Sequence, residues 1–337
     1  MRKIAIATAC LAIVSIGPVR AVGQGTKAAV APVLDRSILH AQVILDHLGF
    51  SPGVLDGRTG KSLAAAVKGF QESRNLKETG VLDRATMRAL HPFRGLRPTK
   101  NLSLEPETLE GPFVDPIPED PAEQAKLPAL GYRSALEKLS EMFHTTPEVL
   151  VELNGPTASL MPGSAFVVPN ALPVSRDYDP KLPADWRKTL SDLNVDANQP
   201  QGAKVVVDKS DEVLRVLDKN GKLVGQFMAT MGSSNDPLPI GKWTIKGASY
   251  NPPFHYNPKL FWDADSSDKA ARLPPGPNGP VGVIWLDLSK PHYGIHGTPE
   301  PSTVGRAESH GCIRLTNWDA ARLSLMIKPG TPAVFQP

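Results

Sequence analysis

The amino-acid sequence predicts a multidomain protein with a small all-α N-terminal domain, a small α+β module and a mostly β C-terminal domain of β-sandwich-like fold. Apolar residues at helical spacing dominate residues 34–92, and short strands separated by turn signals dominate residues 202–337. Between them, proline-rich segments at 93–128 and 171–201 flank a short patterned segment at 129–170. The chain of 337 residues is also longer than a typical single domain.

The first 21 residues are typical of a secretory signal peptide. Arg2 and Lys3 supply a basic start, an apolar run follows from Ile4 to Ile16, and small residues flank Arg20. The apolar run is shorter than a membrane span requires, so we expect cleavage and export, with retention as an uncleaved anchor as the alternative. No later segment of the sequence approaches a membrane span.

The formal charge of +3 comes entirely from this leader. Without Arg2, Lys3 and Arg20, the chain has 34 basic and 34 acidic residues. A balanced charge lacks the basic excess that marks nucleic-acid binding, so we expect no nucleic-acid partner. The hydrophobic share of 41% and the charged share of 21% are those of a soluble globular protein.

Residues 34–92 contain a small internal repeat, because Gly-Val-Leu-Asp occurs at 53–56 and again at 80–83. Each copy follows one helix-like segment and precedes another. Asp83 is a typical cap for a third helix that ends at Leu90. The sequence therefore predicts a small three-helix core, with two apolar faces supplied by Ile38, Leu39, Val43, Leu45, Leu48, Leu63, Val67 and Phe70.

Residues 129–170 predict two short helices and a strand. Leu136, Leu139 and Phe143 have helical spacing, and Thr146-Pro147 is a typical cap and first-turn pair for the second helix. The segments on both sides of this module, 93–128 and 171–201, are predicted to be linkers.

The C-terminal domain begins with strand-like segments that end in turns, and Asn220-Gly221 is a strong hairpin signal. Further strands are predicted in GKWTIKG, VGVIWLDL, YGIHG and PAVF. A late helix is expected from Asn317, which we predict to be its cap.

The residues with the most chemical potential lie between Tyr293 and Leu315. Cys312 is the only cysteine expected in the mature protein, because Cys10 lies in the leader. A reactive thiol needs a base and oxyanion donors nearby, and His296 is close enough if the loop from 298 to 308 folds back. That loop contains two prolines and a glycine, which favour turns.

Residues next to Cys312 supply candidates for the other roles. Gly311 allows an unusual backbone angle, so the N–H groups from His310 to Cys312 are able to converge on one oxygen. If the chain is extended after Cys312, Arg314 points to the same side and is able to hold a carboxylate.

Two simpler interpretations stay open at this point. A single cysteine is more often an inert core residue than a nucleophile. A zinc site formed by His292, His296, His310 and Cys312 is the second, but the spacing matches no common zinc pattern. We therefore expect no metal and no organic cofactor.

The HGT motif at 296–298 followed by SHGCIRL at 309–315 resembles the signature of the L,D-transpeptidase catalytic domain, and the resemblance covers about residues 202–336. It implies a mostly β fold that acts on peptidoglycan stem peptides. It assigns Cys312 as the nucleophile, His296 as the base and the Gly297 carbonyl as its orienter. Residues Ser309, His310, Gly311 and Arg314 are implied in oxyanion stabilisation and substrate positioning.

The resemblance also implies the reaction. The thiolate attacks the carbonyl of the third stem residue, expected to be diaminopimelate, and releases D-alanine. An amine on another stem or on a lipoprotein then resolves the thioester. One alternative is that water is the acceptor, which would make the protein an L,D-carboxypeptidase or endopeptidase. Another is that the protein binds peptidoglycan without catalysis. Location in the periplasm or cell envelope follows from this interpretation.

Four aromatic residues of this domain are candidates for the wall of a substrate groove: Tyr256, Trp262, Trp285 and Tyr293. The alternative is that they are buried in the core, which is more common for aromatic residues in a β domain.

Both N-terminal units also resemble known modules. LGFSPGVLDGRTG, AAVKGFQ and TGVLDRATMRAL resemble a peptidoglycan-binding domain, and VLVELNG with the closing FVVP resembles a LysM glycan-binding module. The opening strand and Gly-Asp-Thr expected of LysM are replaced by GYRSAL. Peptidoglycan stem peptides and glycan are therefore the expected partners, and spacer roles for both units stay open.

Overall fold

The computed structural model describes residues 33–337 apart from 262–263, 266, 308 and 310. The predicted signal peptide, Cys10, His310 and Trp262 lie outside the described residues. Within the described part of the chain, no helix has the length and apolar character needed to cross a membrane.

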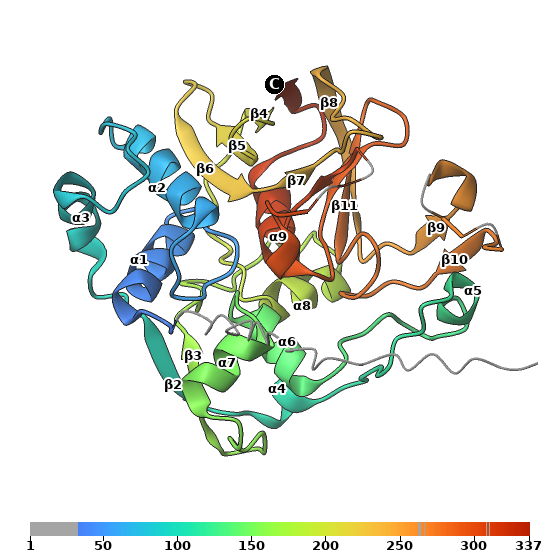
Figure 1. The fold of residues 1–337 in the computed structure, drawn as a ribbon, viewed down its shortest axis with the longest axis horizontal. Helices are drawn as coiled ribbons and strands as arrows, with labels where there is room; N and C mark the ends of the chain where they lie inside the picture. The colour runs from blue at the N-terminus through green and yellow to red at the C-terminus, as the bar shows by residue number, and fades with distance from the viewer. Residues whose placement is uncertain (1–32, 262–263, 266, 308, 310) are drawn as a thin grey trace, which may run out of the picture. The chain divides into compact units, whose positions relative to one another are not determined.

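The N-terminal domain contains the predicted three helices, α1 (Arg36–His47), α2 (Lys61–Ser73) and α3 (Arg84–Leu90), followed by a 3-10 turn, η1 (His91–Phe93) (Figure 1). Asp83 caps α3 as predicted, because its side chain accepts a hydrogen bond from the backbone N–H of Thr86. The helices bury one apolar cluster that includes Ile44, Leu45, Val67, Phe70 and Leu90.

The Gly-Val-Leu-Asp repeat has a structural explanation. The buried Gln42 of α1 accepts hydrogen bonds from the backbone of Asp56 and Gly57 at the end of the first copy. The buried Gln71 of α2 accepts from Gly80 at the start of the second copy and donates to the carbonyl of Val81. Each copy is thus a turn held by a glutamine from the preceding helix.

In the middle unit, four helices lie in the chain between two paired strands. Strand β2 (Thr99–Ser103) pairs antiparallel with β3 (Ala165–Pro169), and α6 (Ala135–Met142) and α7 (Pro147–Asn154) lie between them in the chain. Two one-turn helices, α4 (Pro106–Leu109) and α5 (Pro121–Gln124), occupy the long connection after β2. The unit has its own core, formed by Leu104, Leu139, Phe143, Leu150, Phe166 and Val168.

The prediction that residues 93–128 form only a linker differs from this structure. Residues 99–103 supply the first strand of the middle unit, so the unit begins well before residue 129. The sequence Thr-Lys-Asn-Leu-Ser carries a single large apolar side chain, and its strand shows no buried face. Periodicity therefore gave no signal for it.

The C-terminal domain is mostly β, as predicted. Within the described residues, nine of its strands and one strand of the N-terminal domain form a ten-stranded sheet in the order β1-β6-β5-β4-β14-β8-β11-β12-β13-β7. The long strand β8 pairs with β14 through its first half and with β11 through its second half, so it joins the two halves of the sheet. The strands are β4 (Lys204–Asp208), β5 (Val213–Leu217), β6 (Leu223–Met228), β7 (Thr230–Met231), β8 (Gly241–Tyr250), β11 (Ile284–Leu288), β12 (Gly294–His296), β13 (Ile313–Arg314) and β14 (Pro332–Gln336).

One edge strand of this sheet comes from the N-terminal domain. Strand β1 (Phe50–Ser51) pairs in parallel with β6, with Phe50 opposite Gln226 and Ser51 opposite Phe227. A second, two-stranded sheet is formed by β9 (Phe254–Tyr256) and β10 (Ala271–Leu273), with a 3-10 turn, η2 (Pro258–Leu260), after β9. Another short turn, η3 (Pro301–Thr303), lies in the loop between β12 and β13.

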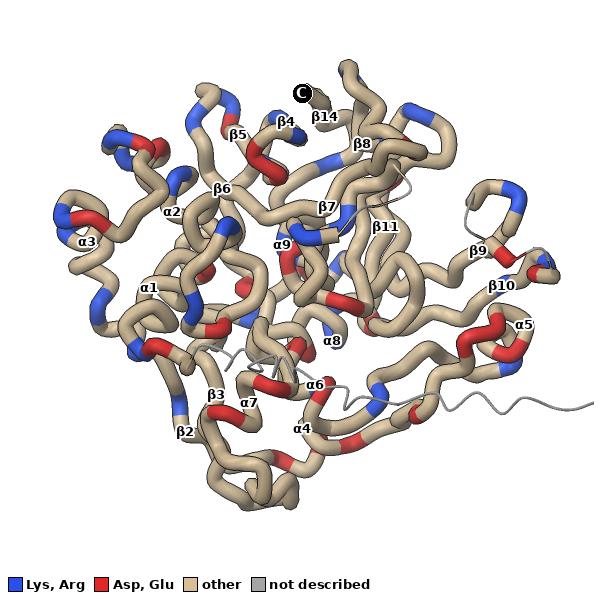
Figure 2. The backbone as a smooth tube through the Cα atoms, in the orientation of Figure 1, with Lys and Arg blue, Asp and Glu red and all other residues tan. Residues whose placement is uncertain are grey.

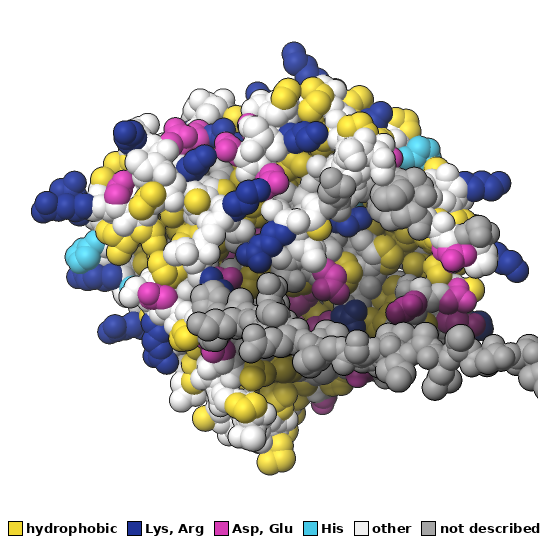
Figure 3. Space-filling model, viewed as in Figure 1, with side chains coloured by type: hydrophobic (Ala, Val, Ile, Leu, Met, Phe, Trp, Pro, Cys, Tyr) yellow, Lys and Arg dark blue, Asp and Glu magenta, His cyan; other side chains and the backbone are white. Residues whose placement is uncertain are grey.

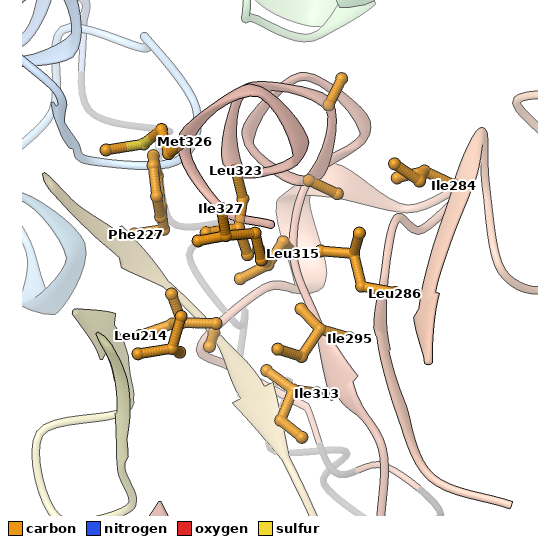
Figure 4. Close-up of a cluster of buried hydrophobic side chains, with 14 of the residues drawn as sticks. Leu214, Phe227, Ile284, Leu286, Ile295, Ile313, Leu315, Leu323, Met326 and Ile327 are labelled. Carbon is orange, nitrogen blue, oxygen red and sulfur yellow. The ribbon is translucent and has the colours of Figure 1, made fainter. Parts of the chain in front are cut away.

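Helix α9 (Asn317–Met326) completes the core of the C-terminal domain and lies beside β11 (Figure 1). Its buried side chains meet apolar residues from both halves of the sheet, among them Leu214, Phe227, Leu286 and Ile295 (Figure 4). The helix differs from the prediction in its cap, because the side chain of Thr316 accepts from Asp319 N. Asn317 is the first helical residue, and its side chain is free for another role.

The segment predicted as the second linker, 171–201, also belongs to this core. It contains α8 (Ala184–Asp192), whose Trp186 and Leu190 are fully buried among the residues of the C-terminal domain. The Trp186 ring stacks on Tyr250 with centroids 4.7 Å apart. Prolines on both sides of this short helix had indicated a connector, and only tertiary contacts reveal its buried face.

A buried polar cluster joins all three units. His144 Nδ1 lies 3.0 Å from Asp46 Oδ2, and the Arg322 guanidinium donates to the Asp46 backbone carbonyl at 2.9 Å. Ser51 donates to the Asp319 carboxylate at 2.7 Å. Burial raises the pKa of Asp46, but Arg322 and His144 outweigh it and hold this pKa well below its usual range.

Elsewhere, acidic and basic residues are interspersed along the backbone and over the visible face (Figures 2 and 3).

Replacing Trp186 with alanine should lower the free energy of unfolding by about 3–5 kcal/mol, the usual cost of deleting a buried aromatic side chain. Urea unfolding followed by circular dichroism measures this change. Lys188→Ala is the matched control on the same helix, because its ion pair with Asp192 is exposed and should contribute at most about 0.5 kcal/mol. Equal stability of the two variants would show that α8 is a connector after all.

Candidate active site

Two short parallel strands carry His296 and Arg314, two of the predicted site residues. Strand β12 pairs in parallel with β13, with Ile295 opposite Ile313 and His296 opposite Arg314. Residues two apart on a strand point to the same side, and so do residues that oppose each other. Cys312 directly precedes β13, so its side chain is expected on the face that carries His296 and Arg314.

His296 is buried, and its ring orientation is fixed by the next residue. Its Nδ1 lies 2.7 Å from the carbonyl oxygen of Gly297. A carbonyl only accepts, so Nδ1 carries the proton and Nε2 is left as the acceptor. The contact predicted between His296 and the Gly297 carbonyl is therefore present, and it leaves the other nitrogen able to take a proton.

The environment keeps His296 neutral. Burial lowers its pKa to about 4, with a further contribution from the positive charge of Arg314, while the hydrogen bond to Gly297 opposes this change. The ring also stacks on Trp285, with centroids 5.4 Å apart and planes 16° from parallel. A neutral, oriented imidazole carries no proton on Nε2 at rest, so this nitrogen is able to accept one during a reaction.

The Cys312 thiol is also kept in its neutral form. Burial raises its pKa, and the negative charge of Asp236 adds to the increase. A hydrogen bond from the backbone N–H of Gly294 and the positive charge of Arg314 act in the opposite direction. The sulfur lies 3.8 Å from the carbonyl oxygen of His292, to which the thiol donates. The resting site thus holds a thiol and an imidazole, not a preformed ion pair.

Ser309 anchors the segment that leads to Cys312. Its hydroxyl accepts from the backbone N–H of Gly232 at 2.6 Å and donates to the Cys312 carbonyl at 2.7 Å. Its own N–H donates to the Gly232 carbonyl at 3.1 Å. The serine therefore holds the cysteine segment against the loop that follows β7. The roles in oxyanion stabilisation and substrate positioning stay predictions.

Gly311 has the backbone conformation that glycine was predicted to provide. Its φ is +91°, in the region that side chains disfavour. A Cβ atom here would also lie 2.7 Å from the Tyr293 ring. Tyr293 thus packs directly against the cysteine segment, and burial raises the pKa of its hydroxyl, with the charges of Cys312 and Asp236 contributing.

The predicted groove aromatics fall into two groups. Trp285 and Tyr293 lie at the site, and the Trp285 ring covers Gly294 so closely that a Cβ there would be 2.4 Å from it. Tyr256 belongs to the separate β9–β10 sheet, where its ring stacks on Phe261 and its hydroxyl donates to Asp268 at 2.6 Å. A groove role for these residues stays a prediction.

Sequence reasoning missed Asp236 and Asn317. Asp236 lies in the loop between β7 and β8, and its charge acts on both Cys312 and Tyr293. Asn317 was predicted to be a helix cap, but its side chain contacts the backbone beside Gly297. No sequence pattern indicates either contact.

Residues 202–335 match the family model of the L,D-transpeptidase catalytic domain. The chain therefore carries an L,D-transpeptidase domain. Residues 36–90 match a second family, described as "Putative peptidoglycan binding domain".

Several relatives share parts of the chain. "Putative L,D-transpeptidase YkuD" of Bacillus licheniformis is 51% identical over 63 residues, which are 19% of this chain and 38% of that protein. "Putative L,D-transpeptidase YqjB" of Bacillus subtilis is 28% identical over 137 residues, covering 39% of this chain and 70% of that protein. The chain spans only 38% and 34% of the two Bacillus YkuD relatives.

Solved structures are similar to part of the chain. An L,D-transpeptidase from Mycobacterium smegmatis is 22% identical, with a TM-score of 0.33, and the match covers 40% of this chain and 58% of that one. The match of an L,D-transpeptidase from Enterococcus faecium, a C442S mutant, has 16% identity and a TM-score of 0.31, covering 41% of this chain and 50% of that one.

The raised pKa of the Cys312 thiol leads to a prediction for the L,D-transpeptidase domain. Iodoacetamide reacts with the thiolate, so the alkylation rate should have its midpoint above the ordinary thiol pKa of about 8.5. Asp236→Asn should move the midpoint to lower pH, because it removes a negative charge. Arg314→Gln should move it to higher pH, because it removes a positive one. Mass spectrometry of quenched samples measures the rate.

Cys312→Ser corrects for any labelling at Cys10, and urea-unfolded protein gives the unperturbed midpoint. Fast alkylation independent of pH between about pH 5 and 7 would indicate a thiolate–imidazolium pair. That result would contradict the neutral resting site.

Proposed function

We propose that the protein is an exported L,D-transpeptidase of the cell envelope that forms crosslinks in peptidoglycan through Cys312. The observation that carries this proposal is the parallel pairing of β12 with β13, which brings His296 beside the cysteine segment, together with the Gly297 carbonyl that leaves Nε2 as an acceptor.

In the first half-reaction, His296 Nε2 takes the thiol proton as the sulfur of Cys312 attacks the carbonyl carbon of the third stem residue. Because the thiol pKa is raised and the histidine pKa is lowered, the proton moves during the attack. The bond between this carbonyl carbon and the nitrogen of the terminal D-alanine then breaks, and the imidazolium gives its proton to the leaving amine. A thioester remains on Cys312.

In the second half-reaction, an acceptor amine attacks the thioester carbon. The carbon–sulfur bond breaks, His296 transfers the amine proton to the sulfur, and the thiol is restored. Diaminopimelate is the expected third stem residue, and an amine of another stem or of a lipoprotein is the expected acceptor. Two half-reactions of this kind predict ping-pong kinetics.

Three further groups have proposed roles in this scheme. Arg314 lies opposite His296 in the register of β12 and β13 and would hold a substrate carboxylate. The backbone from Ser309 to Cys312 would stabilise the oxyanion. Trp285 and Tyr293 would form one wall of the groove for the stem.

The acylation step is testable on the intact protein. Incubation with a tetrapeptide stem should add the mass of the acyl tripeptide and release D-alanine, whereas Cys312→Ala and Cys312→Ser should show neither. Addition of an amine-bearing stem should then remove the adduct and produce a crosslinked product. Mass spectrometry follows every species.

The alternatives give different products. Free tripeptide as the sole product, with or without the amine, would identify an L,D-carboxypeptidase. No adduct and no D-alanine release from folded wild-type protein would overturn the enzymatic proposal and favour a binding protein.

The N-terminal units are proposed to hold the catalytic domain at the wall. Residues 36–90 match a family described as peptidoglycan-binding, and in residues 99–169 the helices α6 and α7, preceded by two one-turn helices, lie between a pair of antiparallel strands. We propose that the strand at residues 99–103 takes the place of the opening strand of such a module. This supports a LysM-like glycan-binding role for the middle unit.

If these units bind the wall, protein alkylated at Cys312 should still sediment with insoluble peptidoglycan, and soluble glycan chains should compete for it. Sedimentation of wild-type and alkylated protein, with an unrelated insoluble polysaccharide as the control, measures this retention. Loss of retention on alkylation would place the binding in the catalytic domain alone and contradict the proposal.

A further inference from the structure

The side chain of Asn317 packs against the backbone of Gly297, the residue after the catalytic histidine. A Cβ atom on Gly297 would lie 2.1 Å from Asn317 Oδ1, and one on Gly282 would lie 2.0 Å from the same atom. Both positions must therefore be glycine for the amide to fit. Asn317 Oδ1 also accepts from the backbone N–H of Val283 at 3.2 Å. The asparagine is fully buried and touches the peptide whose carbonyl orients His296.

The other end of this amide is held by the middle unit. Asn317 Nδ2 lies 3.0 Å from both carboxyl oxygens of Glu141, a buried residue of α6. A third contact runs from Nδ2 to the carbonyl of Pro277 at 3.2 Å. A chain of contacts thus runs from Glu141 through Asn317 and Gly297 to Nδ1 of His296.

We propose that Glu141 is a positioning residue for His296: the middle unit, through this carboxyl group, fixes the Asn317 amide and thereby the Gly297 carbonyl that sets the tautomer and orientation of the catalytic imidazole. The L,D-transpeptidase domain therefore depends on a side chain that lies outside residues 202–335. Only the kinetic part of this inference depends on the proposed function.

The interface around Glu141 contains other hydrogen bonds between the two units. The backbone of Leu130 bonds to Pro275 at 2.9 Å, and Asn278 donates to Leu130 and Gly131 at 3.0 and 2.8 Å. Glu141 adds a buried acid to this interface, and burial raises its pKa to about 8, with Glu137 and Glu300 contributing. Hydrogen bonds from Asn317 and Tyr132 lower this pKa and only partly offset the burial. Burying an acid costs folding free energy unless the acid is hydrogen-bonded.

The raised pKa also guides the choice of variants. At neutral pH the carboxyl group is mostly protonated, so Glu141→Gln is a close mimic that keeps one acceptor oxygen toward Asn317. Glu141→Leu removes both acceptors at similar volume. Asn317→Ala breaks the chain of contacts at its other end. Glu148→Gln is the matched control, because Glu148 lines the same cavity of about 290 Å³ beside Glu141 and is exposed.

The first measurement needs no substrate. In protein labelled with ¹⁵N-histidine, NMR reports which ring nitrogen of His296 carries the proton and at what pH the ring titrates, and His296→Gln assigns the signals. We expect wild type, Glu141→Gln and Glu148→Gln to keep the proton on Nδ1. Glu141→Leu and Asn317→Ala should show a mixture of tautomers, and the double variant should show no more than either single variant.

The second measurement is turnover of the stem substrate. Glu141→Leu should lower kcat by about tenfold or more with little change in KM, because misplacement of a catalytic group by about 1 Å costs up to about 100-fold. Glu141→Gln should recover most of the loss. Circular dichroism confirms that each variant is folded, and Asn317→Ala carries the test if Glu141→Leu is not folded.

The two measurements separate the inference from the proposed function. Unchanged His296 signals and kcat in folded Glu141→Leu and Asn317→Ala would overturn the positioning role. Altered His296 signals, with no turnover even in wild type, would support the positioning role and contradict the proposed function instead.

Discussion

The pairing of β12 with β13 is the constraint on which the site depends. Antiparallel strands are joined by a tight turn, but parallel strands need a long connection. Here that connection is the loop from Gly297 to Cys312, with its short turn η3. The register places His296 opposite Arg314, and a shift of one residue would send one of them to the other face. Ser309 and Gly311 hold the end of the loop where this register requires it.

Burial gives the site its chemistry as well as its geometry. It disfavours the charged form of each group, so the pKa of Cys312 rises while that of His296 falls to about 4. A preformed thiolate–imidazolium pair is therefore disfavoured, and the charges of Arg314 and Asp236 adjust the thiol in opposite directions. In such a site, the thiol becomes reactive when a substrate is bound, because its proton moves to the imidazole as the sulfur attacks.

Local signals made parts of this structure predictable. The cap at Asp83, the positive φ of Gly311 and the contact of His296 with Gly297 involve residues near one another in the chain. Strand β2 and helix α8 were not predicted, because β2 has a polar sequence and α8 reveals its buried face only in the folded core. The contact of Glu141 with Asn317 joins residues far apart in sequence, and no periodicity indicates it.

Helix α9 explains why the units of this chain are not simply tethered. Asn317 bonds to the middle unit, Asp319 accepts from Ser51 of the N-terminal domain, and Arg322 bonds to Asp46 of α1. These side chains are buried, and removal of either partner unit would leave a charge or an amide without its bonds, at a cost larger than that of most surface changes. Because α9 follows β13 closely, the helix that contacts both N-terminal units also lies next to the strand that follows Cys312. The contacts with the two N-terminal units and the position of the cysteine segment are thus linked through one element.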